Sequence, residues 1–391
     1  MKILIFAHAL RAGGGRTTCI NLLSALGRVN TTEDIHLIVP DQPEFKIPDI
    51  QKCGNVQYFS RRLGHLSRWY FDTIEMPRLI RKLSPDLVWS MGGLGLAEPK
   101  CKQAISIQYP YLFYDAKNSG RLSLTSRFKD YFFQRRFWRQ LPRTQLIFCQ
   151  TNSVAQRLQE LGFMGRTIVT GKSFEPKQSA NQSLNATSDL PKPDSEKFNF
   201  FYLTRYYPHK GLEILLDLFR KHSAELENVV LYITISAEQH KNARRFLQKI
   251  QHYDLESKIV NLGPLREDQF SYYYEACDGL LMPTRLESFS GTYLESMHFG
   301  LPILTSDLDF AHDVCGDAAL YFDPWDTQSI LMSIKKLETN EALRRRLILA
   351  GHERLKTKFS KSWESIVITI LGELQSLGRV NFPAEGADYK L

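Results

Sequence analysis

The stretch GLLMPTRLESFSGTYLESMHFGLPILTSD, residues 279–307, begins and ends with an apolar run of the length of a buried strand. Between the two runs, Ser290 has the side chain of a helix N-cap, and Gly300 and Pro302 mark a helix stop. This spacing predicts a helix over 291–299. Because strands joined through a helix pair in parallel, the stretch predicts one strand–helix–strand unit of an α/β fold.

The same alternation of apolar runs and helical patterns recurs along the chain. With 391 residues, the chain is too long for one ordinary core, so its length predicts two domains or three. Nearly continuous apolar strands separated by helices indicate parallel sheets that are covered on both faces. The other predicted strands are 2–8, 35–40, 86–92, 104–109, 146–151, 167–171, 198–204, 229–236, 259–264 and 318–322.

The domain boundaries follow from composition. The stretch 175–197 is rich in Ser, Asn and Pro and has almost no large apolar residue, so it predicts an interdomain loop. Near the end, the pattern over 361–377 predicts a helix with one apolar stripe to bury. We expect two α/β domains, a linker, a final helix and a tail, in the ranges 1–172, 173–197, 198–360, 361–378 and 379–391.

Composition indicates a globular protein of a reducing compartment. A hydrophobic content of 43% and a charged content of 24% are typical of soluble domains. The six cysteines form no C-x-x-C pair, which argues against a zinc site or a disulfide framework and favours the cytosol. The N-terminal apolar run is short for a signal peptide and no clear cleavage site follows, so it predicts a buried strand. No apolar run approaches the ~20 residues of a transmembrane helix.

The net charge of +8 is unevenly placed, because the segment 117–143 has eight cations and one anion, with aromatic residues between them. Three interpretations are open: a helix with a solvated basic face and an aromatic core face, a surface for anionic lipid, or a surface for nucleic acid. The eight cations are Lys117, Arg121, Arg127, Lys129, Arg135, Arg136, Arg139 and Arg143.

A run of glycines, with Gly14 and Gly15 at its end, follows the first predicted strand. Residues without side chains let a backbone approach a ligand closely, and amides at a helix start favour anions. The run does not match the G-x-G-x-x-G pattern of dinucleotide-binding folds. A phosphate cradle and a tight turn therefore both remain open.

Two cations stand where a predicted strand gives way to a helix. Arg205 ends the strand, and Lys210 with Gly211 begins the helix. Cations are unfavourable at a helix N-terminus, by about 0.3–1 kcal/mol each, unless an anion lies between them. An anion-binding pair and ordinary surface basicity both explain the pattern.

Two glutamates, Glu287 and Glu295, enclose the start of the helix predicted over 291–299, and small or hydroxyl residues lie between them. A carboxylate accepts two hydrogen bonds from a diol, and the free amides of a first helical turn donate to phosphate oxygens. This order of groups suits a nucleotide-diphosphate sugar. A capping loop followed by surface glutamates explains the cap, but it leaves the lack of aliphatic residues unexplained.

The E-x7-E spacing of Glu287 and Glu295, together with TRYYPHKGLE at 204–213, resembles the retaining family 4 glycosyltransferases. The resemblance is densest over 198–335 and looser over 1–172, where SPDLVWSMGG and the glycine run also match. It implies the GT-B architecture, in which two Rossmann-like, doubly wound parallel-sheet domains face each other across a cleft. In that family the final helices often cross back to the N-terminal domain.

The resemblance also implies roles for individual residues. Glu295 would hold the ribose hydroxyls and Glu287 the transferred sugar, while Arg205 and Lys210 would neutralise the leaving diphosphate. Gly14 and Gly15 would lie at the donor on the side of the other domain. The backbone amides expected to approach the sugar and phosphates are those of Phe289, Ser290, Gly291 and Thr292.

The chain departs from the family pattern at two places. A histidine–aspartate pair follows an N-terminal strand in many members, whereas this chain has Gln108 and Tyr109 there. After the last strand, DLDFAHDVCGDA replaces the usual Gly-Gly-x-x-Glu and resembles members that build bacterial surface polysaccharides. Asp307 and Asp309 spell D-x-D, a metal motif of another glycosyltransferase architecture. We expect no metal and no cofactor, because Arg205 and Lys210 could already balance the diphosphate charge.

The expected activity is transfer of a hexose, with retention, from a nucleotide-diphosphate sugar to a glycan or lipid-linked glycan. The basic segment 117–143 suits an enzyme that meets its acceptor at the inner face of a membrane, so we expect anionic lipid rather than nucleic acid as its partner. Three alternatives differ in simple assays. An epimerase converts the donor without an acceptor, a glycoside hydrolase cleaves sugars without a nucleotide, and a sensor binds without turnover.

Overall fold

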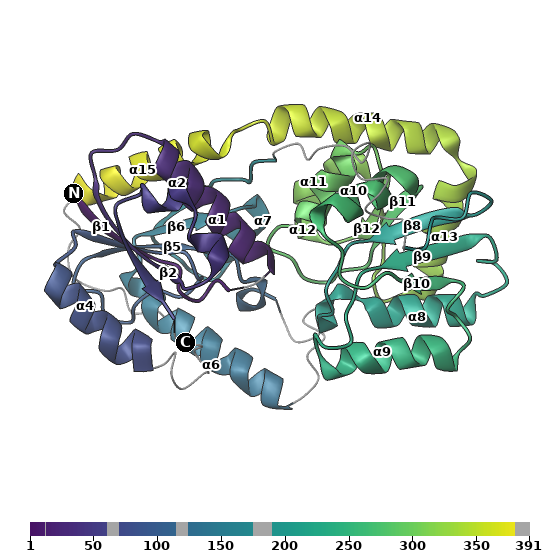
Figure 1. Cartoon of the computed structure of the whole chain (residues 1–391), viewed down its shortest axis with the longest axis horizontal. Helices are drawn as coiled ribbons and strands as arrows, with labels where there is room; N and C mark the ends of the chain where they lie inside the picture. Colours follow the sequence, from purple (N-terminus) through teal and green to yellow (C-terminus); the bar gives the residue numbers. More distant parts are fainter. Residues whose placement is uncertain (12, 61–69, 115–123, 175–189, 380–391) are drawn as a thin grey trace. The chain divides into compact units, whose positions relative to one another are not determined.

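The computed structural model describes the chain except for residues 12, 61–69, 115–123, 175–189 and 380–391 (Figure 1). The described residues form two compact units. Unit 1 is built from described residues of 1–114, 124–173 and 361–379, and unit 2 from residues 174 and 190–360.

Unit 1 contains a seven-stranded sheet in the order β3-β2-β1-β4-β5-β6-β7, in which every pair of neighbours is parallel. Its third strand escaped the sequence prediction, because the residues of NVQYF are only partly buried or exposed and form no apolar run. The strands are β1 (Lys2–Phe6), β2 (Asp34–Pro40), β3 (Asn55–Phe59), β4 (Leu87–Ser90), β5 (Lys102–Ser106), β6 (Leu146–Cys149) and β7 (Arg166–Val169).

The helices of unit 1 cover its sheet (Figure 1). The last helix of the chain packs against the first, and its predicted stripe is buried in the same core as the sheet. The helices, including short turns labelled η, are α1 (Gly13–Arg28), η1 (Pro43–Phe45), α2 (Pro48–Gln51), η2 (Phe71–Glu75), α4 (Met76–Leu83), η3 (Pro110–Leu112), α6 (Leu124–Gln140), η4 (Leu141–Arg143), α7 (Asn152–Glu160) and α15 (Trp363–Arg379). The stripe consists of Trp363, Ile366, Ile370, Leu374 and Leu377.

Unit 2 contains a six-stranded sheet in the order β10-β9-β8-β11-β12-β13, again parallel throughout. The strands are β8 (Phe198–Tyr202), β9 (Val229–Ile233), β10 (Ile259–Asn261), β11 (Gly279–Met282), β12 (Ile303–Ser306) and β13 (Ala319–Phe322). The helices are η7 (Pro208–Lys210), α8 (Leu212–Lys221), α9 (Lys241–His252), α10 (Glu267–Ala276), α11 (Gly291–His298), α12 (Asp309–Cys315), η8 (Gly316–Ala318), α13 (Thr327–Thr339) and α14 (Glu341–Lys358).

The prediction of two Rossmann-like α/β units with parallel sheets is confirmed. In each sheet the strand order reverses beside the first strand, between β1 and β4 in unit 1 and between β8 and β11 in unit 2. Open parallel sheets bind ligands at the carboxyl ends of strands where the order reverses. This rule directs attention to the segments that follow β8 and β11.

Candidate nucleotide-sugar site

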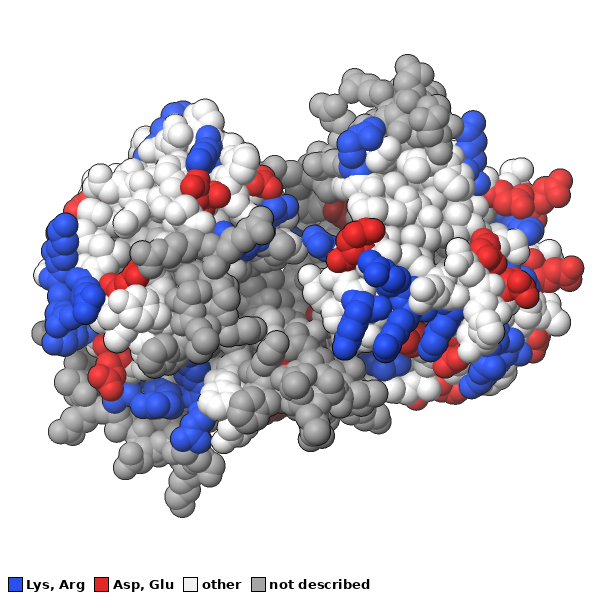
Figure 2. Space-filling model, turned by 60° about the horizontal axis from the view of Figure 1, so that its bottom comes forward, with Lys and Arg blue, Asp and Glu red and all other residues white. Residues whose placement is uncertain are grey.

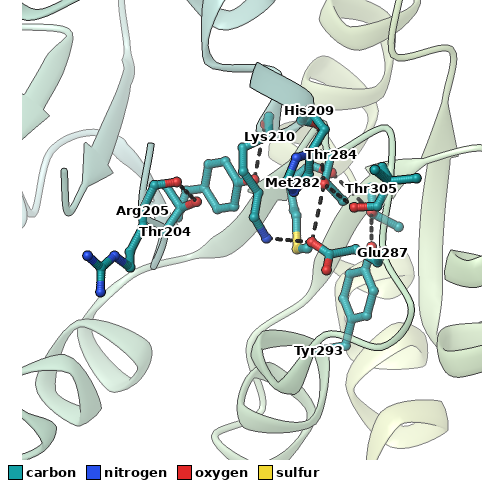
Figure 3. Close-up of polar contacts among 11 residues, drawn as sticks. Thr204, Arg205, His209, Lys210, Met282, Thr284, Glu287, Tyr293 and Thr305 are labelled. Atoms are coloured by element: carbon teal, nitrogen blue, oxygen red, sulfur yellow. Dashed lines mark hydrogen bonds and ion pairs between the residues drawn. The ribbon is translucent and has the colours of Figure 1, made fainter. Parts of the chain in front are cut away.

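Two buried, oppositely charged side chains meet where β8 and β11 end. Lys210 lies in η7, which follows β8, and Glu287 lies in the loop after β11. The two strands are neighbours in the sheet, so residues 77 apart in sequence come into contact. The Lys210 Nζ donates to the Glu287 carboxylate (Figure 3), with only 16% and 12% of the two side chains exposed.

The environment of the pair favours the charged form of Lys210. Burial lowers the pKa of Lys210, but the neighbouring Glu287 carboxylate outweighs burial and the pKa is raised. The Thr284 Oγ1 lies 3.2 Å from the Glu287 Oε1 and donates to it. The site therefore offers an ammonium group, which can donate to a ligand anion, beside a carboxylate, which can accept from a ligand hydroxyl.

This pairing refines the sequence-based expectation. The resemblance assigns Lys210 to the diphosphate and Glu287 to the sugar, as though the two side chains acted separately. In the structure they touch, so the charge of Lys210 is already balanced by Glu287 before any ligand arrives. Each residue therefore holds the other in place.

A buried hydrogen-bond network lies beneath the pair (Figure 3). The Tyr202 hydroxyl donates to the carbonyl oxygen of Lys210 at 3.0 Å. The hydroxyl groups of Tyr293 and Thr305 share a hydrogen bond of 2.7 Å, and the Thr305 Oγ1 also donates to the Met282 carbonyl at 3.0 Å. Because satisfied buried networks rigidify their surroundings, these bonds fix the two loops that carry the pair.

Gly211 joins η7 to α8 and lets the two loops approach each other. Its φ of +71° lies in the left-handed region, which favours glycine. A Cβ at this position would lie 2.3 Å from the carbonyl oxygen of Pro283, in the loop after β11. The backbone just after Lys210 thus lies against the backbone that precedes Glu287, and a glycine permits this close approach.

Gly211→Ala is expected to lower the free energy of unfolding by about 2 kcal/mol or more, because the left-handed conformation costs a side chain about 1–2 kcal/mol and the contact with Pro283 adds to it. Urea denaturation measures the loss. The matched control is Gly263→Ala, since Gly263 has a φ of +70° but open space around its would-be Cβ. Equal losses in the two variants would show that the close approach contributes nothing.

Arg205 does not join the pair. Its side chain is exposed, and its guanidinium forms no hydrogen bond or ion pair with the residues that the structure describes. Figure 3 shows the guanidinium directed away from Lys210 and Glu287. The sequence places both cations after one strand, but only Lys210 is built into the buried network.

The predicted helix after Glu287 is present as α11, and Ser290 occupies its N-cap position. The Ser290 side chain, however, makes no capping hydrogen bond, which corrects the expected role of its hydroxyl. The amides of Gly291 and Thr292, in the first turn, donate no hydrogen bond to any described residue. Phe289 lies against Phe359, with the ring centroids 5.9 Å apart. The start of α11 thus has free amides that can donate to an anion.

Glu295 lies one turn into α11 and has a partner that the sequence did not indicate. The Tyr274 hydroxyl, from α10, donates to the Glu295 Oε2 at 2.8 Å. Tyr274 is buried, and its ring lies parallel to that of Phe299 at a centroid distance of 5.5 Å. Burial, followed by the charge of Glu295, raises the pKa of Tyr274 well above its usual range, so the hydroxyl remains a donor.

The glycine run belongs to unit 1, where it forms the first turn of α1 instead of a loop ahead of the helix. The helix begins at Gly13, whose φ of +71° lies in the left-handed region. A Cβ at Gly15 would lie 2.9 Å from the Gln108 Oε1, whereas Gly14 has open space. Gln108 therefore lies beside the glycine turn.

The acidic residues of the D-x-D sequence do not gather as metal ligands. Asp307 accepts from His312, with the Oδ1 and Nε2 atoms 2.6 Å apart. Within the described residues, no three His, Cys, Asp or Glu side chains lie in an arrangement that could hold a metal ion. In the same part of the chain, no helix has both the length and the apolar character needed to cross a membrane.

Comparison with known proteins finds a sequence family that matches part of this chain. Residues 185–354 match the family described as "Glycosyl transferases group 1". Curated relatives include the serotype-specific mannosyltransferase WbdA of Escherichia coli, 28% identical over 141 residues, and the O-antigen chain mannosyltransferase RfbU of Salmonella typhimurium, 24% identical over 156 residues. These matches span 36% and 40% of this chain but only 17% and 42% of the two relatives.

Solved structures resemble this chain over almost its full length. Sucrose-phosphate synthase from Thermosynechococcus elongatus has a TM-score of 0.71 at 16% identity and covers 96% of this chain and 98% of its own. WaaG, a glycosyltransferase involved in lipopolysaccharide biosynthesis, has a TM-score of 0.70 at 13% identity and covers 95% and 100%. Anabaena HepE in complex with UDP-glucose reaches 0.71 at 16% identity, with 96% and 100% covered. At these identities the likeness shows a shared GT-B fold, which confirms the predicted fold class.

Proposed function

We propose, from the premise that the chain contains a group 1 glycosyltransferase domain, that it transfers a hexose from a nucleotide-diphosphate sugar to a glycan or lipid-linked glycan. The observation that carries this proposal is the buried Lys210–Glu287 pair, with Glu287 in the loop that leads into α11. The free amides of Gly291 and Thr292 begin that helix, and Glu295 follows one turn later. We further propose the retaining, family 4 type of reaction, which the spacing of Glu287 and Glu295 supports.

Each group has a chemical task in this proposal. Glu295, fixed by Tyr274, accepts hydrogen bonds from the ribose hydroxyls, and the amides of Gly291 and Thr292 donate to the diphosphate. Glu287 accepts from a hydroxyl of the sugar. As the bond between the sugar and the diphosphate breaks, negative charge grows on the leaving oxygen, and Lys210 stabilises it. Each preorganised donor of this kind lowers the activation barrier by on the order of 2.7–4 kcal/mol.

The acceptor belongs, in this proposal, to bacterial surface-polysaccharide synthesis. The relatives named for O-antigen chain and serotype-specific mannosyl transfer support this assignment, and they make a mannosyl nucleotide the first donor to test. No cofactor or metal is proposed, because Lys210, Arg205 and the amides of α11 supply the donors that a diphosphate needs.

The test is an assay of the purified protein with a panel of nucleotide sugars, with and without lipid-linked glycan acceptors. We expect a sugar to appear on the acceptor, with its anomeric configuration retained. Conversion of the donor without an acceptor would identify an epimerase instead, and tight binding without any product would identify a sensor. Cleavage of a glycan in the absence of a nucleotide would identify a hydrolase.

Peripheral association with an anionic membrane, at its cytoplasmic face, is a further part of the proposal. On α6 the side chains of Tyr131 and Phe132 are 55% and 53% exposed, and Arg135 and Arg139 are exposed as well. Arg136 instead pairs with buried Asp72 in unit 1 at 2.7 Å, so not every cation of the segment faces solvent. The side chains of Lys117, Arg121, Arg127 and Lys129 lie outside the described residues.

Arg205→Ala is expected to raise the Kd for a nucleoside diphosphate about tenfold while leaving the unfolding temperature unchanged. An exposed guanidinium without a partner contributes little to folding, whereas its loss removes a charged hydrogen bond to a phosphate, worth about 1.5 kcal/mol. Calorimetric titration with the nucleoside diphosphate and with the bare nucleoside separates loss of a phosphate contact from a general loss of nucleotide binding. If affinity for the nucleoside falls as much, Arg205 does not contact the phosphates.

A further inference from the structure

A second group of basic side chains lies on α9 of unit 2. Its sequence, KNARRFLQKIQH, contains four Lys or Arg residues and no acidic residue. The buried side of the helix is apolar and consists of Ala243, Phe246 and Ile250. All four cations are exposed on the remaining surface of the helix: Lys241, Arg244, Arg245 and Lys249.

The arrangement of these cations is unfavourable for the isolated fold. Lys241 and Arg245, like Arg245 and Lys249, are four residues apart, and like charges at that spacing destabilise a helix. Lys241 and Arg244 also stand in the first turn, where cations oppose the helix dipole. None of the four forms an ion pair with a residue in the described part of the chain. Packing within unit 2 therefore does not explain why these positions are basic.

Neighbouring residues extend the surface. Arg220 and Lys221 end α8, which contacts α9, and both are exposed. Tyr253, just after α9, is 38% exposed, and the Arg220 guanidinium lies 5.5 Å from the centre of its ring. Figure 2 shows Lys and Arg side chains gathered over the face of unit 2 that carries α9. Exposed acidic residues also occur on the same or neighbouring segments: Asp217, which pairs with Arg220 at 3.7 Å, Glu238, Asp254 and Glu256.

The form of this surface favours an extended, planar anion. The four cations of α9 span about 12 Å along the helix, at 1.5 Å per residue, and they stand on a convex element. One phosphate group would contact few of them, whereas the headgroups of a bilayer can meet all of them together. An exposed tyrosine beside basic residues is also typical of the interface between a membrane and water.

We propose that the basic face of α9 (Lys241, Arg244, Arg245 and Lys249) docks unit 2 on a bilayer that contains anionic phospholipid. This inference deepens the proposed function, on which it rests, because a lipid-linked acceptor is presented at such a surface. Each cation near an anionic membrane adds attraction that falls off within a Debye length, so the interaction weakens as salt increases.

The test compares the full-length protein with the variant K241Q/R244Q/R245Q/K249Q by co-sedimentation with phosphatidylcholine vesicles, with and without phosphatidylglycerol. We expect the variant to partition about tenfold or more weakly onto the anionic vesicles and to bind the neutral ones like the wild type. The matched control is K336Q/R345Q/R346Q/K356Q, which removes the same charge from exposed positions of α13 and α14.

Two outcomes would overturn the proposal. If the control loses as much binding as the α9 variant, net charge rather than this face is responsible. If the α9 variant loses affinity for single-stranded DNA but keeps its affinity for anionic vesicles, the face binds a different polyanion. Sugar transfer to a short, water-soluble acceptor should be unchanged in the α9 variant. If the wild type shows no such transfer, the proposed function is refuted, but the vesicle experiment still tests whether α9 binds the membrane.

Discussion

Glu295→Ala is expected to raise the Kd for a nucleoside diphosphate about 100-fold. In the proposed complex the Glu295 carboxylate accepts one hydrogen bond from each of two ribose hydroxyls. Hydrogen bonds to charged groups contribute about 1.5 kcal/mol or more each, so losing two costs about 3 kcal/mol, or a factor of about 100. Calorimetric titration of the purified variant measures the change.

The decisive comparison for Glu295 uses the ribose itself. The wild type and Glu295→Ala should bind the 2′,3′-dideoxy nucleotide with equally low affinity, because this ligand lacks the two hydroxyls that Glu295 would contact. Equal losses of affinity for both ligands in the variant would mean that Glu295 does not contact the ribose. Tyr274→Phe provides an intermediate, because it removes the donor at the Glu295 Oε2 but leaves the carboxylate. We expect a rise in Kd of about fivefold, confined to the ribonucleotide.

The matched control for Tyr274 is Tyr273→Phe. Both tyrosines lie in α10 and are buried, but the Tyr273 hydroxyl donates to the carbonyl oxygen of Pro191 at 2.7 Å, away from Glu295. Each substitution removes one buried hydroxyl and one hydrogen bond, so both should cost similar stability. If Tyr273→Phe weakens the ribonucleotide as much as Tyr274→Phe does, the effect arises from the stability of α10 and not from orientation of Glu295.

The fold could be predicted where the sequence has a strong local pattern. In unit 2, runs such as 279–284 and 302–307 predicted strands because a strand that is covered on both faces is apolar throughout. β3 was missed for the opposite reason, since it has polar and exposed residues at the edge of its sheet. The start of α11 was predicted from a serine and a later glycine. The bonding of the Ser290 hydroxyl could not be predicted, because it depends on loop geometry.

The site was harder to predict, because its contacts join distant parts of the chain. The sequence shows Lys210 and Glu287 as separate motifs, and they meet only because β8 and β11 are neighbours in the sheet. Tyr274 stands in a run of three tyrosines whose spacing gives no sign of which hydroxyl faces Glu295. Arg205 looks equivalent to Lys210 in sequence. In the structure only Lys210 is buried and paired, whereas Arg205 is exposed. Local patterns therefore indicated which residues to examine, and topology determined which of them touch.

Lys210→Ala is expected to lower kcat/KM by about 100-fold or more, and Glu287→Ala by a similar factor, with the double variant no worse than either single variant. Lys210 stabilises the leaving diphosphate, and removal of one preorganised donor costs on the order of 2.7–4 kcal/mol. Glu287 acts on the sugar and also holds Lys210. Because the two side chains touch and the double variant should be no worse than either single variant, a double-mutant cycle should show a coupling energy about equal to one single loss, on the order of 2.7 kcal/mol. If the two losses multiply, the residues act independently and the pair has no role in turnover.

Stability separates a catalytic role of the pair from a structural one. Lys210→Ala leaves the Glu287 carboxylate buried without its cation, which costs about 3–5 kcal/mol of folding free energy, whereas Lys210→Met with Glu287→Gln removes both charges and should recover most of that loss. The double variant should nevertheless remain inactive, because neither new side chain can neutralise a diphosphate. The control is Lys335→Ala, which breaks a partly exposed pair with Glu338 and should cost no more than about 1 kcal/mol. Recovery of activity together with stability would show that the pair serves only to hold the two loops together.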